Sequence, residues 1–327
     1  MKGSIALKKV KDQIKRIEFL PLIFAYFLMI VFFSITTQYF LSVKNFMNIA
    51  LYASIVGILA CSSTLVVAAG KIDLSPGSVM ALTSCVMGII THNGQSIWVA
   101  IAACMAISMF AGALNGIMIS YVGINPFIAT LATMQIFRGF AFILTNALSM
   151  TIIDPVLKFI GRSYLFGVIP HSLILMIIVA VIFVYVANKT TLGRKFFVIG
   201  GNERVAFLSG INVKFTIVIL FIIHGAVTGI ASVLWTSQIG AALPGAAMNV
   251  NFQAISAAVL GGVSLAGGKG SVAGAIVGAL MMGTLNNGMV MLDVSSFWQD
   301  VIIGFVLVFA VTLDIIKNVR ASAVRVK

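Results

Sequence analysis

Histidine, cysteine and acidic side chains carry most enzyme chemistry and metal binding, but this 327-residue sequence spaces them for neither purpose. Its three histidines, His92, His171 and His224, are far apart, and its three cysteines form no Cys-x-x-Cys pair. No nucleophile and base are arranged in the pattern of a catalytic site. We therefore predict a chain that has no catalytic residues and no metal site.

One glycine-rich segment comes near to a phosphate-binding loop. Residues 261–270 read GGVSLAGGKG, whereas the loop requires the pattern Gly-x-x-x-x-Gly-Lys-Ser/Thr. Val263 stands where the first glycine is needed, and Gly270 stands where the magnesium-binding hydroxyl is needed. We expect this chain to bind no cofactor and not to hydrolyse ATP. If it takes part in active transport, the energy must therefore reach it through contact with a partner.

Composition and the lengths of the apolar runs predict an all-α membrane protein. Hydrophobic residues make up 61% of the chain and charged residues 9%, which is too little polar surface for a soluble protein of this length. The apolar runs are continuous over about 20 residues, as in membrane-spanning helices, whereas barrel strands would be about ten residues long and alternating. We predict a polytopic helix bundle with about ten transmembrane helices.

The predicted spans form a transmembrane domain over residues 20–316, between a basic segment, 1–19, and a basic tail, 317–327. The spans lie at about residues 20–40, 47–69, 75–92, 97–121, 126–146, 170–187, 215–237, 250–266, 272–291 and 297–316. With the N-terminus inside, 17 of the 21 Lys and Arg residues fall in cytoplasmic segments, as the positive-inside rule requires. Both termini are therefore predicted in the cytoplasm. The net charge of +13 reflects this bias rather than nucleic-acid binding, which needs a folded basic module.

Four polar residues in the spans are candidates for lining the pathway of a polar solute. Asn115, Asn286 and Asn287 are amides within spans or near their ends, and Arg138 is the one cation predicted inside a span. The amides could equally join neighbouring helices, and Arg138 could reach the outer interface or brace the carbonyl groups of a broken helix. His224, in the middle of a span, either bonds a nearby carbonyl or faces a neighbouring helix or a water-filled path.

The acidic residues are predicted to lie away from the middle of the membrane. Asp73 precedes the third span in a short cytoplasmic turn, where it and Ser75 cap the helix or act at a gate or dimer contact. Proton and sodium relays are usually built on buried carboxylates. The absence of such a carboxylate from the predicted interior disfavours an ion-coupled transporter.

Two regions of the chain echo each other at an offset of 171 residues. Residues 112–116 and 123–127 read GALNG and GINPF, and residues 283–287 and 294–298 read GTLNN and VSSFW. The echo pairs Asn115 with Asn286 on helices of opposite direction, as inverted repeats would; chance similarity between apolar helices is the alternative. Glycine pairs at 112 and 116, 225 and 229, and 274 and 278 predict close helix packing, within the bundle or between subunits.

The longest polar segment, residues 188–214, carries five cations and one acidic residue between two apolar spans. A basic loop of this length on the cytoplasmic side is predicted to be a docking surface for a cytoplasmic partner.

Several stretches together resemble the permease subunits of bacterial ABC importers for ribose and related monosaccharides, a family that includes autoinducer-2 importers. They occur in the family's order between about residues 50 and 315: GKIDLSPGS (70–78), NPFIATL (125–131), FRG (137–139), GGN (200–202), LSGI (208–211), the glycine-rich stretch 261–271 and LNNG (285–288).

The resemblance implies a permease of the bacterial inner (plasma) membrane that pairs with a second permease copy or paralogue and is surrounded by membrane lipid. It implies two cytoplasmic ATPase subunits, which bind ATP and magnesium, and an extracytoplasmic sugar-binding protein. A short helix or turn of the docking loop would fit the ATPase, with Ala206 and Gly210 on one helical face. The residues assigned to this docking are Gly200, Gly201, Asn202, Ala206 and Gly210.

The sequence departs from the family pattern at three places. Lys71 replaces a glycine, residues 203–206 read ERVA instead of a Pro-Glu-Ala-Ala run, and Asn251 lies near the position of an acidic residue. The first two changes alter the charge at the cytoplasmic face. We predict the permease subunit of an importer for a sugar or similar small polar solute. The alternative is an ATP-independent facilitator or channel, which would have no use for a docking loop.

Overall fold

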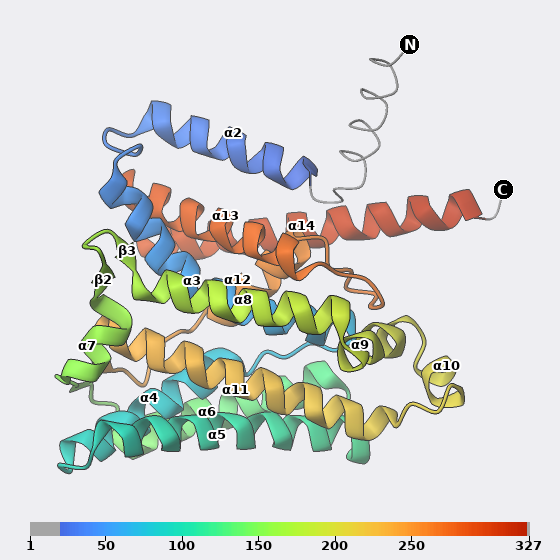
Figure 1. Ribbon diagram of the computed structural model, residues 1–327, viewed down its shortest axis with the longest axis horizontal. Coiled ribbons are helices and arrows are strands. Elements are labelled where there is room, and N and C mark those ends of the chain that lie inside the picture. Colours follow the sequence, from blue (N-terminus) through green and yellow to red (C-terminus); the bar gives the residue numbers. More distant parts are fainter. Residues whose placement is uncertain (1–19, 326–327) are drawn as a thin grey trace.

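The computed structural model describes residues 20–325 and consists almost entirely of helices packed into one bundle (Figure 1). The predicted N-terminal segment, 1–19, lies outside the described residues. The longer helices are α2 (Leu20–Thr36), α3 (Val43–Ala68), α4 (Pro76–His92), α5 (Ile97–Ile117) with the π-helix η1 (Met118–Val122), α6 (Pro126–Thr145), α8 (His171–Lys189), α11 (Val213–Ile239), α12 (Val250–Leu260), α13 (Val272–Met291) and α14 (Ser296–Arg325). The short elements are α7 (Pro155–Arg162), α9 (Thr191–Gly201), α10 (Glu203–Leu208) and two antiparallel strand pairs, β1 (Met150–Thr151) with β4 (Ala241–Ala242) and β2 (Tyr164–Leu165) with β3 (Ile169–Pro170).

The helices confirm the prediction of an all-α, polytopic bundle. Each of the ten predicted spans contains a helix. Within residues 20–325, seven segments are long and apolar enough to cross a membrane: Val43–Ala68, Ile97–Val122, Pro126–Thr145, His171–Lys189, Val213–Ile239, Val272–Met291 and Ser296–Ile316. The remaining three, in α2, α4 and α12, are shorter. Helix α14 continues to Arg325, so the predicted tail is helical as far as it is described.

The predicted docking loop is largely helical. Helices α9 and α10 occupy it, at the right-hand end of the bundle in Figure 1. Thr190, Asn202 and Asn212 cap the starts of α9, α10 and α11, because the side-chain oxygen of each accepts a backbone amide hydrogen from the first turn of its helix. These polar residues thus lie where one helix ends and the next begins.

Two helices at the centre of the bundle, α4 and α12, each follow a non-helical segment. Segment 69–75 leads from α3 to α4, and segment 240–249 leads from α11 to α12. Pro76 begins α4, because proline lacks the backbone N–H that the first helical position leaves unpaired and its fixed φ suits a helix. Since α3 and α11 run in opposite directions in Figure 1, the two segments enter the bundle from opposite ends.

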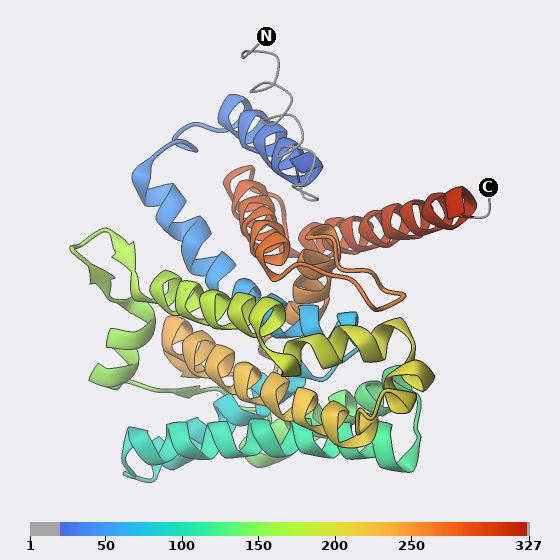
Figure 2. The same cartoon turned by 45° about the vertical axis from the view of Figure 1, so that its right-hand side comes forward.

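Helices α3 and α11 enclose these segments, whereas α2 and α14 lie outside. Nearly all side chains of α3 from Ile49 onward are buried. Figure 2 shows α2 at the edge of the bundle and the C-terminal part of α14 projecting away from it. Phe24 and Phe305 on these two helices are exposed, as expected for side chains that face lipid or another subunit.

Two of the predicted glycine pairs pack against each other in the interface between α5 and α11. Gly112 of α5 lies against the carbonyl group of Phe221, and Gly225 of α11 lies against the carbonyl group of Ser108. Neither glycine has room for a side chain, so the two backbones approach closely. The third pair, Gly274 and Gly278, packs in the same way on the end of α12. All three pairs therefore contribute to packing within the bundle.

We predict that Gly225→Leu lowers the free energy of unfolding by roughly 1–3 kcal/mol, because the added side chain would force α5 and α11 apart. Unfolding of the purified chain in detergent would measure the change. Gly304→Leu on α14 is the matched control, since no described atom beyond the adjacent residues and backbone of its own helix lies within 4 Å of the position its Cβ would take. Equal destabilisation by the two substitutions would contradict this account of the interface.

Candidate functional site

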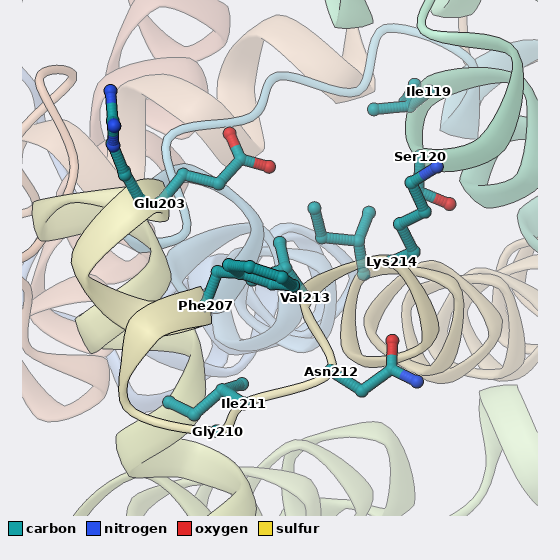
Figure 3. A pocket seen from close by; sticks show the side chains of 11 residues that line it. Ile119, Ser120, Glu203, Phe207, Gly210, Ile211, Asn212, Val213 and Lys214 are labelled. Carbon is teal, nitrogen blue, oxygen red and sulfur yellow. The ribbon is translucent and has the colours of Figure 1, made fainter.

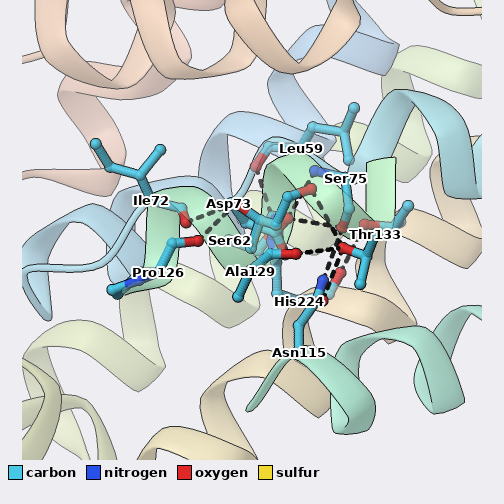
Figure 4. A network of polar contacts seen from close by, with 12 residues as sticks. Leu59, Ser62, Ile72, Asp73, Ser75, Asn115, Pro126, Ala129, Thr133 and His224 are labelled. Atoms are coloured by element: carbon cyan, nitrogen blue, oxygen red, sulfur yellow. Dashed lines mark hydrogen bonds and ion pairs between the residues drawn. The ribbon is translucent and has the colours of Figure 1, made fainter. Parts of the chain in front are cut away.

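Asp73, in segment 69–75, is the centre of a buried polar network (Figure 4). Its Oδ1 accepts hydrogen bonds from the backbone N–H of Ser75 (2.8 Å) and from the Ser75 hydroxyl (2.7 Å). Its Oδ2 lies 3.8 Å from Nε2 of His224 on α11. The other imidazole nitrogen, Nδ1, is 2.8 Å from the hydroxyl of Ser62 on α3. The network therefore ties the start of α4 to both long central helices.

Asn115 of α5 extends the network to α6. Its Nδ2 donates to the Ser75 hydroxyl (3.0 Å), and its Oδ1 accepts from the Thr133 hydroxyl (2.8 Å). Thr130, one turn earlier on α6, donates to the carbonyl oxygen of Ile72 (3.3 Å). The amide of Asn115 thus bonds to neighbouring helices, as predicted for an amide that joins helices. Whether a solute also passes it stays a prediction.

The predicted position of Asp73 in a short turn at the cytoplasmic face is wrong. His224, its neighbour, is the twelfth residue of α11, about 16 Å along that helix from its first residue. The carboxylate therefore lies deep in the bundle. Segment 69–75 runs inward from the end of α3, which brings Asp73 to His224.

The structure bears on one of the two roles predicted for Asp73 and Ser75, which are capping of the helix and a gate or dimer contact. Ser75 is the N-cap residue of α4, but its hydroxyl makes no capping bond. Instead Asp73 accepts the Ser75 amide, so the carboxylate fixes the approach to the helix. A role at a gate stays a prediction. His224 faces neighbouring elements, which is one of the arrangements predicted for it.

Arg138 of α6 braces the second non-helical segment. Its Nη1 donates to the carbonyl oxygens of Pro244 (2.9 Å) and Ala246 (2.6 Å). Arg138 is the thirteenth residue of α6, about 18 Å along it, so the brace lies well inside the bundle. Of its predicted roles, Arg138 therefore has that of bracing the carbonyl groups of a broken helix, and its side chain does not reach the outer interface.

The two asparagines of α13 differ from Asn115. Asn286 Nδ2 donates to Oε1 of Gln299 on α14 (3.3 Å). Oδ1 of Asn287 is buried and has no hydrogen-bond partner among residues 20–325. Asn115 and Asn286 lie near the ends of α5 and α13, at opposite ends of the bundle (Figure 1).

A pocket of about 760 Å³ opens beside the docking segment, between η1, α10 and the start of α11 (Figure 3). Phe207 of α10 points into it, with Glu203, Lys214 and Ser120 around it. Val205, Phe207 and Leu208 are exposed, although all three are apolar. An exposed apolar group within a basic segment is what a protein partner would cover.

Two residues assigned to docking do not share a helical face as predicted. Ala206 is 0% exposed, so it faces the bundle and not a partner. Gly210 lies beyond the end of α10 with φ of 80°, a left-handed conformation that glycine adopts without strain. Asn202 caps α10, and Gly200 packs against the Ala68 carbonyl. Gly201 is exposed beside it.

The sequence analysis does not single out Phe207 and Leu208, whose side chains the structure exposes. The pair is visible in the sequence, because adjacent bulky apolar residues are unusual in a segment as polar as 188–214. Lys71, noted above only as a departure from a pattern, places its Nζ 3.5 Å from Oε2 of Glu203, the first residue of α10. It joins segment 69–75 to the docking helix.

The sequence matches the family model described as branched-chain amino acid transport system / permease component over residues 45–311. It is 37% identical over 290 residues to the ribose import permease protein of Bacillus subtilis, covering 88% of this chain and 90% of that protein. It is 36% identical over 274 residues to the L-arabinose transport system permease protein of Escherichia coli, covering 84% and 83%. A probable ABC transporter permease protein of Escherichia coli is 32% identical over 321 residues, covering 98% and 95%. No solved structure matches at a significant level.

We predict that Asn115→Ala lowers the free energy of unfolding by about 1–3 kcal/mol, because it removes two buried hydrogen bonds between elements, one to the Ser75 hydroxyl and one from the Thr133 hydroxyl. Denaturation of the purified chain would measure this. Asn188→Ala, at an exposed position of α8, is the control and should unfold like the wild type. If Asn115→Ala also unfolds like the wild type, the network does not hold α4 in place.

Proposed function

This chain belongs to the family of branched-chain amino acid transport system permease components and is a permease subunit of an ABC importer; we propose that it carries a monosaccharide or similar small polar solute into the cell. The observation that carries the proposal is similarity over most of both chains to proteins named for ribose and L-arabinose transport. Within this proposal, ATP and magnesium bind to separate ATPase subunits, and an extracytoplasmic binding protein delivers the solute.

We propose ten membrane crossings, with both termini in the cytoplasm. Counting the three short helices as crossings gives the total of ten. Helix α4 with segment 69–75, and helix α12 with segment 240–249, would each make one crossing. Support for the orientation comes from the position of the basic residues. Lys71 contacts Glu203 of α10, and Lys269 follows Gly268, which packs on Gly201 of α9. Lys44 and Lys158 belong to the start of α3 and to α7, which lie at the opposite end of the bundle from α9 and α10 in Figure 1.

We also propose that the bundle contains inverted repeats. The starts of α3, α4, α5 and α6 are followed by those of α11, α12, α13 and α14 after 170 to 175 residues. Corresponding helices run in opposite directions (Figure 1). In both halves the second helix is the short one that follows a non-helical segment. This agreement supports a repeat more strongly than the sequence echo alone.

The ATPase would dock on α10 and the pocket beside it. The exposed apolar side chains of Val205, Phe207 and Leu208 would enter the partner, and Arg204 and Lys214 would face its acidic residues. Movement of α10 would reach the centre of the bundle through Lys71, because only one residue separates Lys71 from Asp73. A second permease subunit would complete the assembly.

An ATP-independent facilitator is the alternative, and the exposed apolar group on α10 disfavours it. Asp73 is a buried acidic residue, so ion coupling is not disfavoured by the lack of a buried carboxylate. Membership of the permease family disfavours it instead.

We predict that Phe207→Asp together with Leu208→Asp reduces co-purification of the cognate ABC ATPase subunit at least tenfold. The two side chains are 68% and 75% exposed, so the substitutions should not disturb folding. The measurement is the amount of ATPase retained by the affinity-tagged chain in detergent. Phe166→Asp, at an 89% exposed position at the opposite end of the bundle, is the control. Undiminished co-purification of the double variant would exclude α10 as the docking element.

A further inference from the structure

The glycine-rich stretch 261–271, which does not match a phosphate-binding loop, is the link between α12 and α13. This α12–α13 link lies at the same end of the bundle as α9 (Figure 1). The backbone N–H of Gly268 in the link donates to the carbonyl oxygen of Ala68, the last residue of α3 (2.8 Å). Segment 69–75 starts at the next residue. The hydrogen bond therefore joins the α12–α13 link to the beginning of segment 69–75.

The end of α9 packs against both of these links with no side chain in between. A methyl group added at Gly267 would lie 2.5 Å from the carbonyl oxygen of Gly200. One added at Gly268 would lie 2.9 Å from Cα of Gly201, and one added at Gly200 would collide with the Ala68 carbonyl. Three chain segments thus touch through their backbones. We call this contact the glycine junction; its members are Gly200, Gly201, Gly267, Gly268 and Ala68.

The α12–α13 link meets the end of α9 this closely because it has glycine at two successive positions. Gly267 and Gly268 have φ of 82° and 74°, in the left-handed region that glycine adopts without strain. Any other residue there would add both backbone strain and a side chain that has no room. Glycine is therefore required twice, for the conformation of the link and for its contact with α9.

Helix α10, which we propose as the docking element, is connected to the glycine junction by two routes. Only Asn202 separates α10 from the end of α9. In addition, Nζ of Lys71 in segment 69–75 lies 3.5 Å from Oε2 of Glu203 at the start of α10. Helix α9 itself is held in the bundle, since Phe196 and Ile199 are buried. A displacement of α10 would therefore reach the junction within a few residues.

A contact between backbones transmits a displacement better than a contact between side chains. A side chain can absorb a small movement by changing its rotamer, whereas the backbone of a packed helix cannot. The Lys71–Glu203 pair alone would be a weak connection, because the Glu203 side chain is 55% exposed and exposed ion pairs contribute little. The glycine junction is the firmer connection between the docking element and the bundle.

We propose that the glycine junction transmits displacement of α10 by the ATPase to two links at once, segment 69–75 in the first half of the bundle and the α12–α13 link in the second half. The inference rests on the proposed function, because it assigns the transmitting contact of an importer that ATP drives. Gly267 and Gly268 act through the backbones that they touch and are positioning residues. This role accounts for the glycines of a stretch that does not match a phosphate-binding loop.

One substitution in the α12–α13 link tests transmission against a matched control. Gly267→Ala would press on Gly200. Gly262→Ala imposes similar strain, since φ is 94°, but no described atom beyond its chain neighbours lies within 4 Å of the added Cβ. Each variant would be assembled with the ATPase and the binding protein in proteoliposomes.

We expect both variants to retain the ATPase and the basal rate of ATP hydrolysis, because the exposed face of α10 is unchanged. In Gly267→Ala, stimulation of hydrolysis by the binding protein loaded with ribose or L-arabinose, and uptake of that sugar, should be roughly tenfold lower than in Gly262→Ala, as expected for altered coupling between distant sites. Equal stimulation and equal uptake in the two variants would overturn the proposal. Loss of the ATPase from Gly267→Ala alone would also overturn it, because the junction would then support docking rather than transmission.

Distances between spin labels give a second test, which needs neither a substitution in the junction nor a sugar. The labels would be attached to Lys195→Cys on α9, Ala266→Cys in the α12–α13 link and Asn93→Cys at the end of α4 remote from segment 69–75, which are exposed positions. The three native cysteines would be replaced by alanine. When a non-hydrolysable ATP analogue binds to the assembled complex, the separation of Ala266 from Asn93 should change and that of Ala266 from Lys195 should not.

A change in the separation of Ala266 from Lys195 would show that the junction opens, and an unchanged separation of Ala266 from Asn93 would show that the link does not move. Either result would overturn the proposal. Wild-type complex that takes up neither sugar would count against the proposed solute class, and the spin labels would still decide whether the junction transmits.

Discussion

The structure depends on satisfying the backbone of two non-helical segments inside a membrane protein, where no water is at hand to pair their amide and carbonyl groups. Helix α6 supplies a partner for each. Thr130 donates to the carbonyl of Ile72 in segment 69–75, and Arg138 donates to the carbonyls of Pro244 and Ala246 in segment 240–249. The buried helices α3 and α11 keep lipid away from both. Helix α6 thus supports both non-helical segments.

The sequence was sufficient to predict the helices and their order, because apolar runs of about 20 residues admit few other structures in a bilayer. It did not reveal how deep each residue lies. A glycine and a proline on either side of Asp73 fit an external turn as well as a segment that re-enters the bundle. Long-range contacts distinguish the two, such as that of Asp73 with His224 and that of Ser75 with Asn115. The partners of Arg138 were equally hidden, since they lie more than a hundred residues away.

Docking on residues 188–214 stays a prediction, but the structure does not place Ala206 and Gly210 as that prediction expected. Helical spacing predicts that Ala206 and Gly210 share one helical face. However, α10 ends at Leu208, and Ala206 faces the inside of the bundle. Phe207 and Leu208 form the exposed face instead. Because Lys71 contacts Glu203 at the start of the same helix, a displacement of α10 by a partner would be felt at Asp73 and then at the start of α4. The Lys71–Glu203 ion pair thus connects α10 with the segment that leads into α4.

The central claim is that this chain moves its solute with energy received by contact at the docking helix. The most direct measurement is uptake of labelled ribose and L-arabinose into proteoliposomes that contain the chain, its ATPase and the external binding protein. The account predicts uptake that stops when ATP is withheld and continues when ionophores collapse the proton and sodium gradients. Uptake by this chain alone, down a concentration gradient and with no ATPase present, would contradict it.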